Sequence, residues 1–327
     1  KQKKNHSRRK VVRKNVKKIT ATRNLLIPTI LTLLTLIIIG TFVLLSQQPL
    51  KNMYGKAVEL PPVAITGCGV ISQPGTYVLE NDIVATDTPC ISIQSENVIL
   101  NGNNREITSI PAEPLPETPI QETTGVLIEK SKSTIQNLTI TGYNKGIHVK
   151  GTHPARIVET TIENTVISSD IATTYLRGVD SQYADTLIIK NSTINLSGIA
   201  TSSGGIVTST TSGIIVLNST IITGNSFSWG MFIQGSTGVG TIGNITISNN
   251  TFHLTSGATT TKYPIGIQLQ ATSGGIINNL AIHDNTFTIQ SNASQSKAIT
   301  LQNGNFTTLF NNTITLKGKA LGGISVT

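Results

Sequence analysis

The chain has few aromatic and few charged residues, and this scarcity argues against several classes of protein. Of its 327 residues, 4% are aromatic and 13% are charged, whereas Ser, Thr, Asn, Ile and Gly are abundant. Such a composition suits short strands joined by tight turns and is unlike that of a helical globule. After Asp185 the only acidic residue is Asp284. This later part of the chain therefore lacks the paired carboxylates that glycosidases use as general acid and base.

Basic charge is also scarce outside one segment. Residues 1–24 carry eleven lysines and arginines and no acid, which leaves fourteen basic against sixteen acidic side chains in the rest. Nucleic-acid binding requires a basic face on the folded part of a protein. We therefore expect no nucleic-acid partner.

One long hydrophobic run is present, at residues 25–45, and it contains no charge. A helix of this length spans the roughly 30 Å hydrocarbon core of a bilayer. The basic segment before it should stay in the cytoplasm, which places residues 46–327 outside. A cleaved signal peptide is the alternative, but no small-x-small cleavage site follows closely. We predict a cytoplasmic tail (1–24), a transmembrane signal-anchor helix in contact with lipid (25–45) and a linker (46–62) in the cell membrane.

Cys68 and Cys90 are the only cysteines. In a domain exported from the reducing cytosol, such a pair predicts a disulfide. A zinc site is the alternative, but it would need two further ligands that the sequence does not place nearby. We expect neither a metal nor a cofactor.

What is abundant is repetition, in two patterns that share a period of about 27 residues. The first is a glycine-apolar-x-apolar segment, which starts at Gly125, Gly146, Gly178, Gly205, Gly230, Gly266, Ala298 and Gly323. The second is an Asx/Glu-x-Thr-apolar block, which starts at Asn137, Glu163, Asn191, Asn218, Asn249, Asp284 and Asn311.

This period predicts an all-β fold, a right-handed parallel β-helix over residues 63–327. Each repeat holds two or three short runs with alternating apolar positions, separated by Gly, Asn or Ser. Apolar residues would then stack inward from coil to coil, and asparagines at the bends could form hydrogen-bonded ladders. An antiparallel sandwich would give no reason for a constant period. Because residue 1 is lysine and the last repeat stops at Thr327, we expect that the sequence is part of a longer protein.

The segment before the repeats carries a family resemblance. It reads Cys-Gly-x-Ile-x-x-Pro-Gly-Thr-Tyr-x-Leu-x-x-Asp-Ile from Cys68 to Ile83, then Cys-Ile-Ser-Ile from Cys90 and Asn-Val-Ile-Leu-Asn-Gly-Asn from Asn97. It resembles secreted right-handed β-helix repeat proteins of the pectate-lyase-like superfamily. The resemblance implies the fold and leaves the activity open, because the superfamily includes lyases, glycosidases, carbohydrate binders and surface proteins.

Strand alternation assigns the outward side chains of the glycine-led strands to two columns, stacked about 4.8 Å apart. One column reads Leu127, His148, Asp180, Val207, Phe232, Gln268, Thr300 and Ser325. The next reads Glu129, Lys150, Gln182, Ser209, Gln234, Gln270, Gln302 and Thr327.

These columns place His148 beside Asp180 and Glu129 beside Lys150. The four residues are candidate catalytic groups, which could transfer a proton on an acidic sugar while Arg156 or Arg177 holds its carboxylate. The alternative is that they form exposed ion pairs, each contributing less than about 1 kcal/mol.

Farther along the same face the columns become polar and uncharged. Candidate binding residues are Trp229, Phe232, Gln234, Gln270 and Gln302. Aromatic rings edged by amides suit sugar rings. The alternative is that the aromatic residues pack at a coil corner and the glutamines form a solubilising ladder.

We therefore expect a surface binding or scaffold module with a polysaccharide as its partner. A polysaccharide lyase or glycosidase is the alternative, and a purely structural stalk is the third possibility. The scarcity of carboxylates favours binding or scaffolding over catalysis.

Overall fold

The computed structural model describes residues 61–110, 122–198, 200–224, 227–235, 241–256, 263–271, 276–293, 295–303, 307–318 and 322–327. These residues form strands, turns and bends without a helix. Within these ranges, no helix could therefore cross a membrane. The predicted tail 1–24, transmembrane helix 25–45 and nearly all of the linker 46–62 lie outside the described residues.

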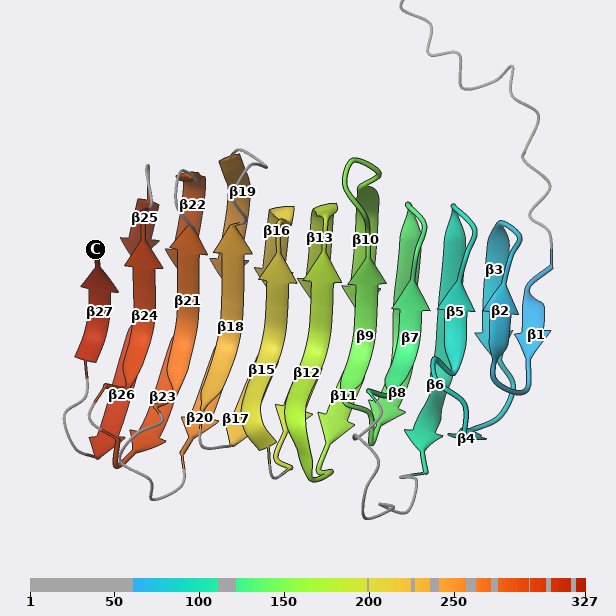
Figure 1. Ribbon diagram of the computed structural model, residues 1–327, viewed down its shortest axis with the longest axis horizontal. Helices are drawn as coiled ribbons and strands as arrows, with labels where there is room; N and C mark the ends of the chain where they lie inside the picture. Colours follow the sequence, from blue (N-terminus) through green and yellow to red (C-terminus); the bar gives the residue numbers. More distant parts are fainter. Residues whose placement is uncertain are drawn as a thin grey trace, which may run out of the picture. The chain divides into compact units, whose positions relative to one another are not determined.

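Ten parallel strands form a single sheet, here called the front sheet, in which they run side by side in one direction (Figure 1). The strands are β2 (Gly69–Ile71), β5 (Ile91–Ile93), β7 (Thr124–Ile128), β9 (Lys145–Lys150), β12 (Thr173–Gln182), β15 (Ala200–Ser209), β18 (Ser228–Gly235), β21 (Ile265–Ala271), β24 (Lys297–Gln302) and β27 (Gly322–Val326). Neighbours in this sheet are one coil apart in the sequence, which is the topology of a parallel β-helix.

The other seventeen strands form the remaining sides of each coil and also pair in parallel. They begin with β1 (Val63–Ile65), β3 (Gly75–Leu79), β4 (Ile83–Ala85), β6 (Val98–Ser109) and β8 (Ser133–Thr141). One side continues with β10 (Ile157–Glu163), β13 (Ala184–Lys190), β16 (Ser212–Leu217), β19 (Thr241–Ser248), β22 (Ile276–His283) and β25 (Thr307–Phe310). The other continues with β11 (Val166–Ser169), β14 (Thr193–Leu196), β17 (Thr220–Gly224), β20 (Thr251–Thr255), β23 (Thr286–Ser291) and β26 (Thr313–Gly318).

The register of the front sheet confirms the predicted glycine repeat. The residues that follow each glycine are Cα partners from strand to strand: Val126, Ile147, Val179, Ile206, Met231, Ile267, Ile299 and Ile324. The steps between copies vary, yet the stacking is continuous, so the extra residues are accommodated between strands.

Close packing explains why glycine begins these strands. A Cβ atom on Gly205 would lie 2.7 Å from the carbonyl oxygen of Gly230 and closer still to Cγ2 of Ile221. A Cβ atom on Gly178 would clash with the equivalent atoms one coil earlier, the carbonyl oxygen of Gly205 and Cγ2 of Ile194. Glycine is therefore required by the approach of two sides of the coil.

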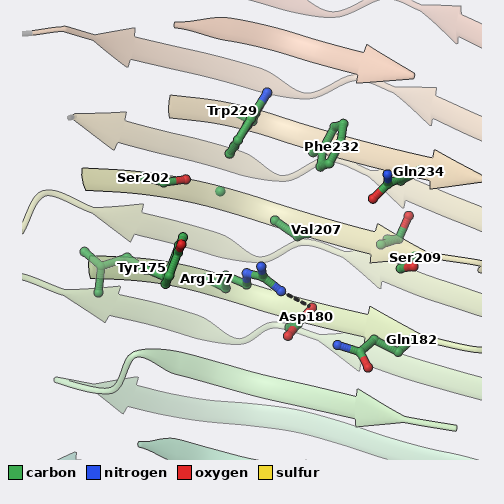
Figure 2. Close-up of a pocket in the computed structure, with 13 residues that line it drawn as sticks. Tyr175, Arg177, Asp180, Gln182, Ser202, Val207, Ser209, Trp229, Phe232 and Gln234 are labelled. Carbon is green, nitrogen blue, oxygen red and sulfur yellow. Dashed lines mark hydrogen bonds and ion pairs between the residues drawn. The ribbon is translucent and has the colours of Figure 1, made fainter. Parts of the chain in front are cut away.

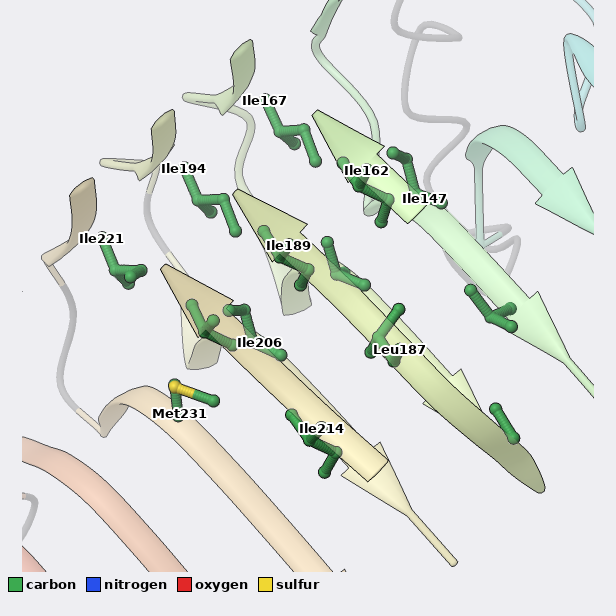
Figure 3. Close-up of a cluster of buried hydrophobic side chains, with 14 of the residues drawn as sticks. Ile147, Ile162, Ile167, Leu187, Ile189, Ile194, Ile206, Ile214, Ile221 and Met231 are labelled. Atoms are coloured by element: carbon green, nitrogen blue, oxygen red, sulfur yellow. The ribbon is translucent and has the colours of Figure 1, made fainter. Parts of the chain in front are cut away.

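Branched aliphatic side chains from all sides of the coil fill the interior (Figure 3). Ile167, Ile194 and Ile221 stack in register on β11, β14 and β17. In the next coils Phe252 and Phe287 take over this column, with nearly parallel rings 4.8 Å apart. Each interior coil thus buries its apolar residues against its two neighbours.

The second predicted pattern marks a bend with left-handed backbone. The residue at the bend has a φ between 49° and 57°, a region that asparagine and aspartate tolerate better than most residues. The bend residues are Asn137, Asn164, Asn191, Asn218, Asn249, Asp284 and Asn311. The block predicted to start at Glu163 therefore starts one residue later. Glu163 ends β10, pairs with Lys190 in register and forms a salt bridge with it.

The predicted asparagine ladder is present at the bend in the early coils. There Nδ2 of Asn164 donates to Oδ1 of Asn137 at 3.4 Å, and Nδ2 of Asn137 donates to Oδ1 of Asn101 at 3.2 Å.

A second ladder is formed by the residue after the bend. The backbone amide of Asn250 donates to Oδ1 of Asn285 at 3.0 Å, and that of Asn285 donates to Oδ1 of Asn312 at 3.1 Å. In earlier coils Ser192 and Ser219 accept the equivalent bonds. The buried polar groups of this corner are thereby satisfied from one coil to the next.

The disulfide predicted between Cys68 and Cys90 is confirmed. Cys90 is fully buried, and its carbonyl oxygen accepts a hydrogen bond from the amide of Gly69 at 2.8 Å. The bond joins the residues just before β2 and β5, so it links the first coil to the second.

Candidate functional site

The outer surface of the front sheet has a pocket between β12 and β18 (Figure 2). Its volume is about 250 Å³. β15 lies between these two strands and contributes the small residues Ser202, Gly204 and Ser209 to the lining. Since neighbouring strands are spaced about 4.8 Å apart, the two strands that carry the walls lie roughly 10 Å from each other.

The register assigns opposite residues of the pocket to three rows. Arg177, Gly204 and Trp229 form the first row. Asp180, Val207 and Phe232 form the second, and Gln182, Ser209 and Gln234 the third. The candidate charged residues and the candidate aromatic residues therefore face each other across a single strand.

The wall on β18 is aromatic and held in place. The rings of Trp229 and Phe232 stack with centroids 5.1 Å apart and an interplanar angle of 18°. Nε1 of Trp229 donates a 2.7 Å hydrogen bond to Oε1 of Gln268, and the rings of Phe227 and Trp229 form a T-shaped contact with their centroids 4.3 Å apart. The indole is thus oriented by Gln268 and Phe227.

Three of the five predicted binding residues line this pocket, namely Trp229, Phe232 and Gln234. Gln270 and Gln302 continue the register of Gln234 on β21 and β24, as the columns predicted. These two glutamines are not among the residues that line the pocket.

The wall on β12 is built around a buried carboxylate. The side chain of Asp180 is 1% exposed, and its Oδ1 lies 2.9 Å from Nη1 of Arg177. Its Oδ2 lies 3.4 Å from Nζ of Lys145, which also reaches Oε2 of Glu122 at 2.7 Å. The hydrogen bond from Lys145 lowers the pKa of Glu122. Asp180 is therefore not the exposed ion-pair member that the alternative interpretation expected.

His148 lies beside Asp180, as predicted. However, its Nε2 is 3.9 Å from Oδ2 of Asp180, which is too long for a hydrogen bond. Burial lowers the pKa of His148 to about 4, and the charge of Asp180 offsets this only in part. The imidazole is therefore neutral at pH 7 and is not hydrogen-bonded to the carboxylate.

The other two catalytic candidates are not joined to this cluster. Ile128 and Val149, which precede Glu129 and Lys150, are Cα partners. Glu129 accepts a 3.3 Å hydrogen bond from Nε2 of Gln94, and no salt bridge joins it to Lys150 within the described part of the chain.

Of the two arginines proposed to hold a sugar carboxylate, only Arg177 is at the pocket. Arg156 precedes β10 and binds Oδ2 of Asp185 at 2.8 Å and two backbone carbonyls, those of Ala184 and Thr210. Arg156 therefore links neighbouring coils.

Sequence reasoning missed a third outward column, made by the residue before each glycine. It reads Thr124, Lys145, Arg177, Gly204, Trp229, Ile265, Lys297 and Gly322. This column holds both cations that contact Asp180 and the tryptophan. The glycine repeat itself was the signal that could have identified it.

Among the described residues, no group of three or more His, Cys, Asp or Glu side chains could hold a metal ion.

The parallel coils, the inward aliphatic stacks and the polar ladders define a parallel β-helix protein. The chain belongs to the family described as right handed beta helix region, which matches residues 124–327. No curated protein matches the chain.

Several solved structures are similar to this chain at low sequence identity. The catalytic domain of an α-1,3-glucanase in complex with nigerose is 11% identical, with a TM-score of 0.40, over 80% of this chain and 59% of that one. The chain thus spans less than two thirds of that domain. The A-module of an Azotobacter vinelandii mannuronan C-5 epimerase is 14% identical, with a TM-score of 0.28, over 78% of this chain and 90% of that one. A Streptococcus pneumoniae surface protein and adhesin is 11% identical, with a TM-score of 0.22, over 77% of this chain and 90% of that one.

Proposed function

We propose that the β-helix binds carbohydrate in the pocket between β12 and β18. The observation that carries this proposal is the pairing of an aromatic wall with a polar wall across small residues. Sugar rings have an apolar C–H face and a hydroxyl-bearing edge. Trp229 and Phe232 suit the former, while Gln182, Gln234 and Arg177 offer hydrogen bonds to the latter.

Binding fits the geometry better than catalysis does. Asp180 is buried, and both of its oxygens lie within salt-bridge distance of cations, so it is poorly placed to exchange protons with a substrate. Nε2 of His148 is shielded from solvent. An enzyme acting on glycosidic bonds would need accessible carboxylates, and this pocket exposes none.

The test is retention of the purified protein on immobilised neutral and acidic polysaccharides, with the products monitored in parallel. We expect retention without cleavage. Phe232→Ala should weaken retention roughly tenfold, because it removes an aromatic contact with the ring. The matched control is Phe310→Ala, since Phe310 is 45% exposed and lies on β25, outside the front sheet.

Equal retention of Phe232→Ala and the unchanged protein would rule out this pocket as the binding site. Cleavage that disappears in Asp180→Asn or His148→Gln would establish the enzymatic alternative instead.

We further propose that the basic segment and the apolar run at residues 25–45 anchor this module at the cell surface, with the β-helix outside. The support is the length of the apolar run and the asymmetry of charge around it. Release of the full chain from membranes by alkaline carbonate would contradict the anchor.

A further inference from the structure

Arg177 provides the charge that the pocket presents to a ligand. Among the residues that line the pocket, only Arg177 and Asp180 are charged. The side chain of Arg177 is 32% exposed, whereas that of Asp180 is 1% exposed. A ligand in the pocket would therefore meet the guanidinium and not the carboxylate.

Asp180 positions this guanidinium and leaves part of it unused. One nitrogen, Nη1, binds Oδ1 of Asp180 at 2.9 Å (Figure 2). An arginine has five N–H donors in a fixed planar arrangement. In the part of the chain that the structure describes, no hydrogen bond is formed by Nε or Nη2 of Arg177. These donors remain available to an anion that offers two oxygens side by side, as a carboxylate or a sulfate group does.

The charges around Arg177 do not cancel the attraction of the pocket for an anion. Asp180 is shared between Arg177 and Lys145. Glu122 balances Lys145, but its side chain is 61% exposed and it is not among the residues that line the pocket. His148 is neutral at pH 7 because burial lowers its pKa to about 4. The hydrogen bond from Lys145 and, to a smaller extent, the charge of Arg177 lower the pKa of Glu122, so the charge of Glu122 does reach Arg177. The residues that line the pocket nevertheless expose no carboxylate to repel an anionic ligand.

Gly204 keeps the space beside Arg177 open. It lies between Arg177 and Trp229 in the register, and a Cβ there would clash with Cγ2 of Val207 and lie 3.9 Å from the indole. The strands that carry Arg177 and Trp229 lie roughly 10 Å apart, and the strand between them places no side chain in this row.

We infer that the ligand is an acidic polysaccharide, whose carboxylate or sulfate group binds Arg177 while the sugar ring contacts Phe232 and Trp229. This inference rests on the proposed function and adds the chemical class of the ligand. Asp180 is a positioning residue in this arrangement, because it fixes the guanidinium without touching the sugar.

The experiment compares an acidic polysaccharide with its carboxyl-reduced form, which has the same backbone without the charge. A sulfated neutral polysaccharide is the third probe and separates sulfate from carboxylate. The protein should bind at least one charged polymer about tenfold more tightly than its uncharged counterpart, because a hydrogen bond to an ion is stronger than one to a neutral group.

Arg177→Gln should reduce binding of the charged polymer about tenfold and leave binding of the uncharged one unchanged. Arg177→Lys retains the counter-charge for Asp180, so it protects the fold, but it loses the planar arrangement and should bind at an intermediate level. Arg105→Gln is the matched control, since Arg105 is an exposed arginine on β6, outside the front sheet.

Three outcomes would overturn the inference or its basis. Equal binding of the charged and uncharged polymers, unaffected by Arg177→Gln, would overturn the inference and leave the proposed function standing. An equal loss in Arg105→Gln would show non-specific attraction of charge and would also overturn it. Failure to bind any of the polymers would contradict the proposed function itself.

Discussion

Burial decides what the charged residues of the front sheet can do. His148 is a representative case, because its side chain is 12% exposed and its neighbours include both Asp180 and Lys145. Removal from water disfavours the protonated ring more than the nearby carboxylate favours it. A histidine that spacing alone marks as a candidate general base is therefore held neutral.

This state of His148 predicts a pH-dependent stability. In the unfolded chain the imidazole has a pKa of about 6.5, whereas in the folded protein the value is lowered to about 4. Between these values the unfolded state binds more protons, so the free energy of unfolding should fall as the pH decreases from 6.5 to 4. The loss should be about 2–3 kcal/mol. Denaturant titrations at several pH values would measure it.

In His148→Gln the dependence over this window should become flatter, because the substituted side chain does not titrate. His253→Gln is the control, since His253 is exposed on β20 and should leave the dependence unchanged. Identical slopes for His148→Gln and the unchanged protein would contradict the assignment.

At the scale of elements, the same contacts hold each coil together at equivalent positions in successive coils. The glycine before each core residue lets the front sheet approach the aliphatic column on β11, β14 and β17. At the bend, Asn250, Asn285 and their serine equivalents link the backbone of one coil to the side chain of the next. The pocket depends on the same regularity, because three consecutive strands supply its two walls and its floor.

Gly205→Ala should destabilise the protein by about 1–3 kcal/mol, because the added methyl group cannot fit between Gly230 and Ile221 without displacing the coil. Gly323→Ala is the matched control in the same repeat, since a Cβ there would have nothing within 4 Å. Unfolding free energies from denaturant titration would compare the two. Equal stability of the two variants would show that close packing is not the reason for the glycine.

At the scale of the whole β-helix, stability is distributed by contacts between neighbouring coils. Each coil packs only on the coils before and after it, so a local change should remain local. The disulfide between Cys68 and Cys90 lies at the beginning of this stack, where the first coil has a single neighbour among the described strands.

Replacing both cysteines by alanine should therefore loosen the first coils and leave the later ones intact. On the chain-entropy model, closing a loop of this size contributes about 3 kcal/mol. Hydrogen exchange should become faster in β2 and β5 and remain unchanged in β18 and β21. Retention on polysaccharide should also persist, because the pocket lies several coils away. A uniform increase in exchange would show that the β-helix unfolds as one unit.

The sequence by itself determined the repeat, the parallel β-helix, the disulfide and the outward columns of the front sheet. It could do so because glycine, asparagine and alternating apolar residues report local requirements of packing and backbone conformation. The anchor at residues 25–45 remains a prediction of the sequence.

Only the tertiary structure decided which outward residues form a site. It identified the column before the glycines, joined Arg177 to Asp180, and placed both opposite Trp229 and Phe232. The reason is physical. The surroundings of Asp180 and the direction of the Trp229 indole depend on neighbours from other coils. Lys145 lies 35 residues before Asp180, and Gln268 lies 39 residues after Trp229.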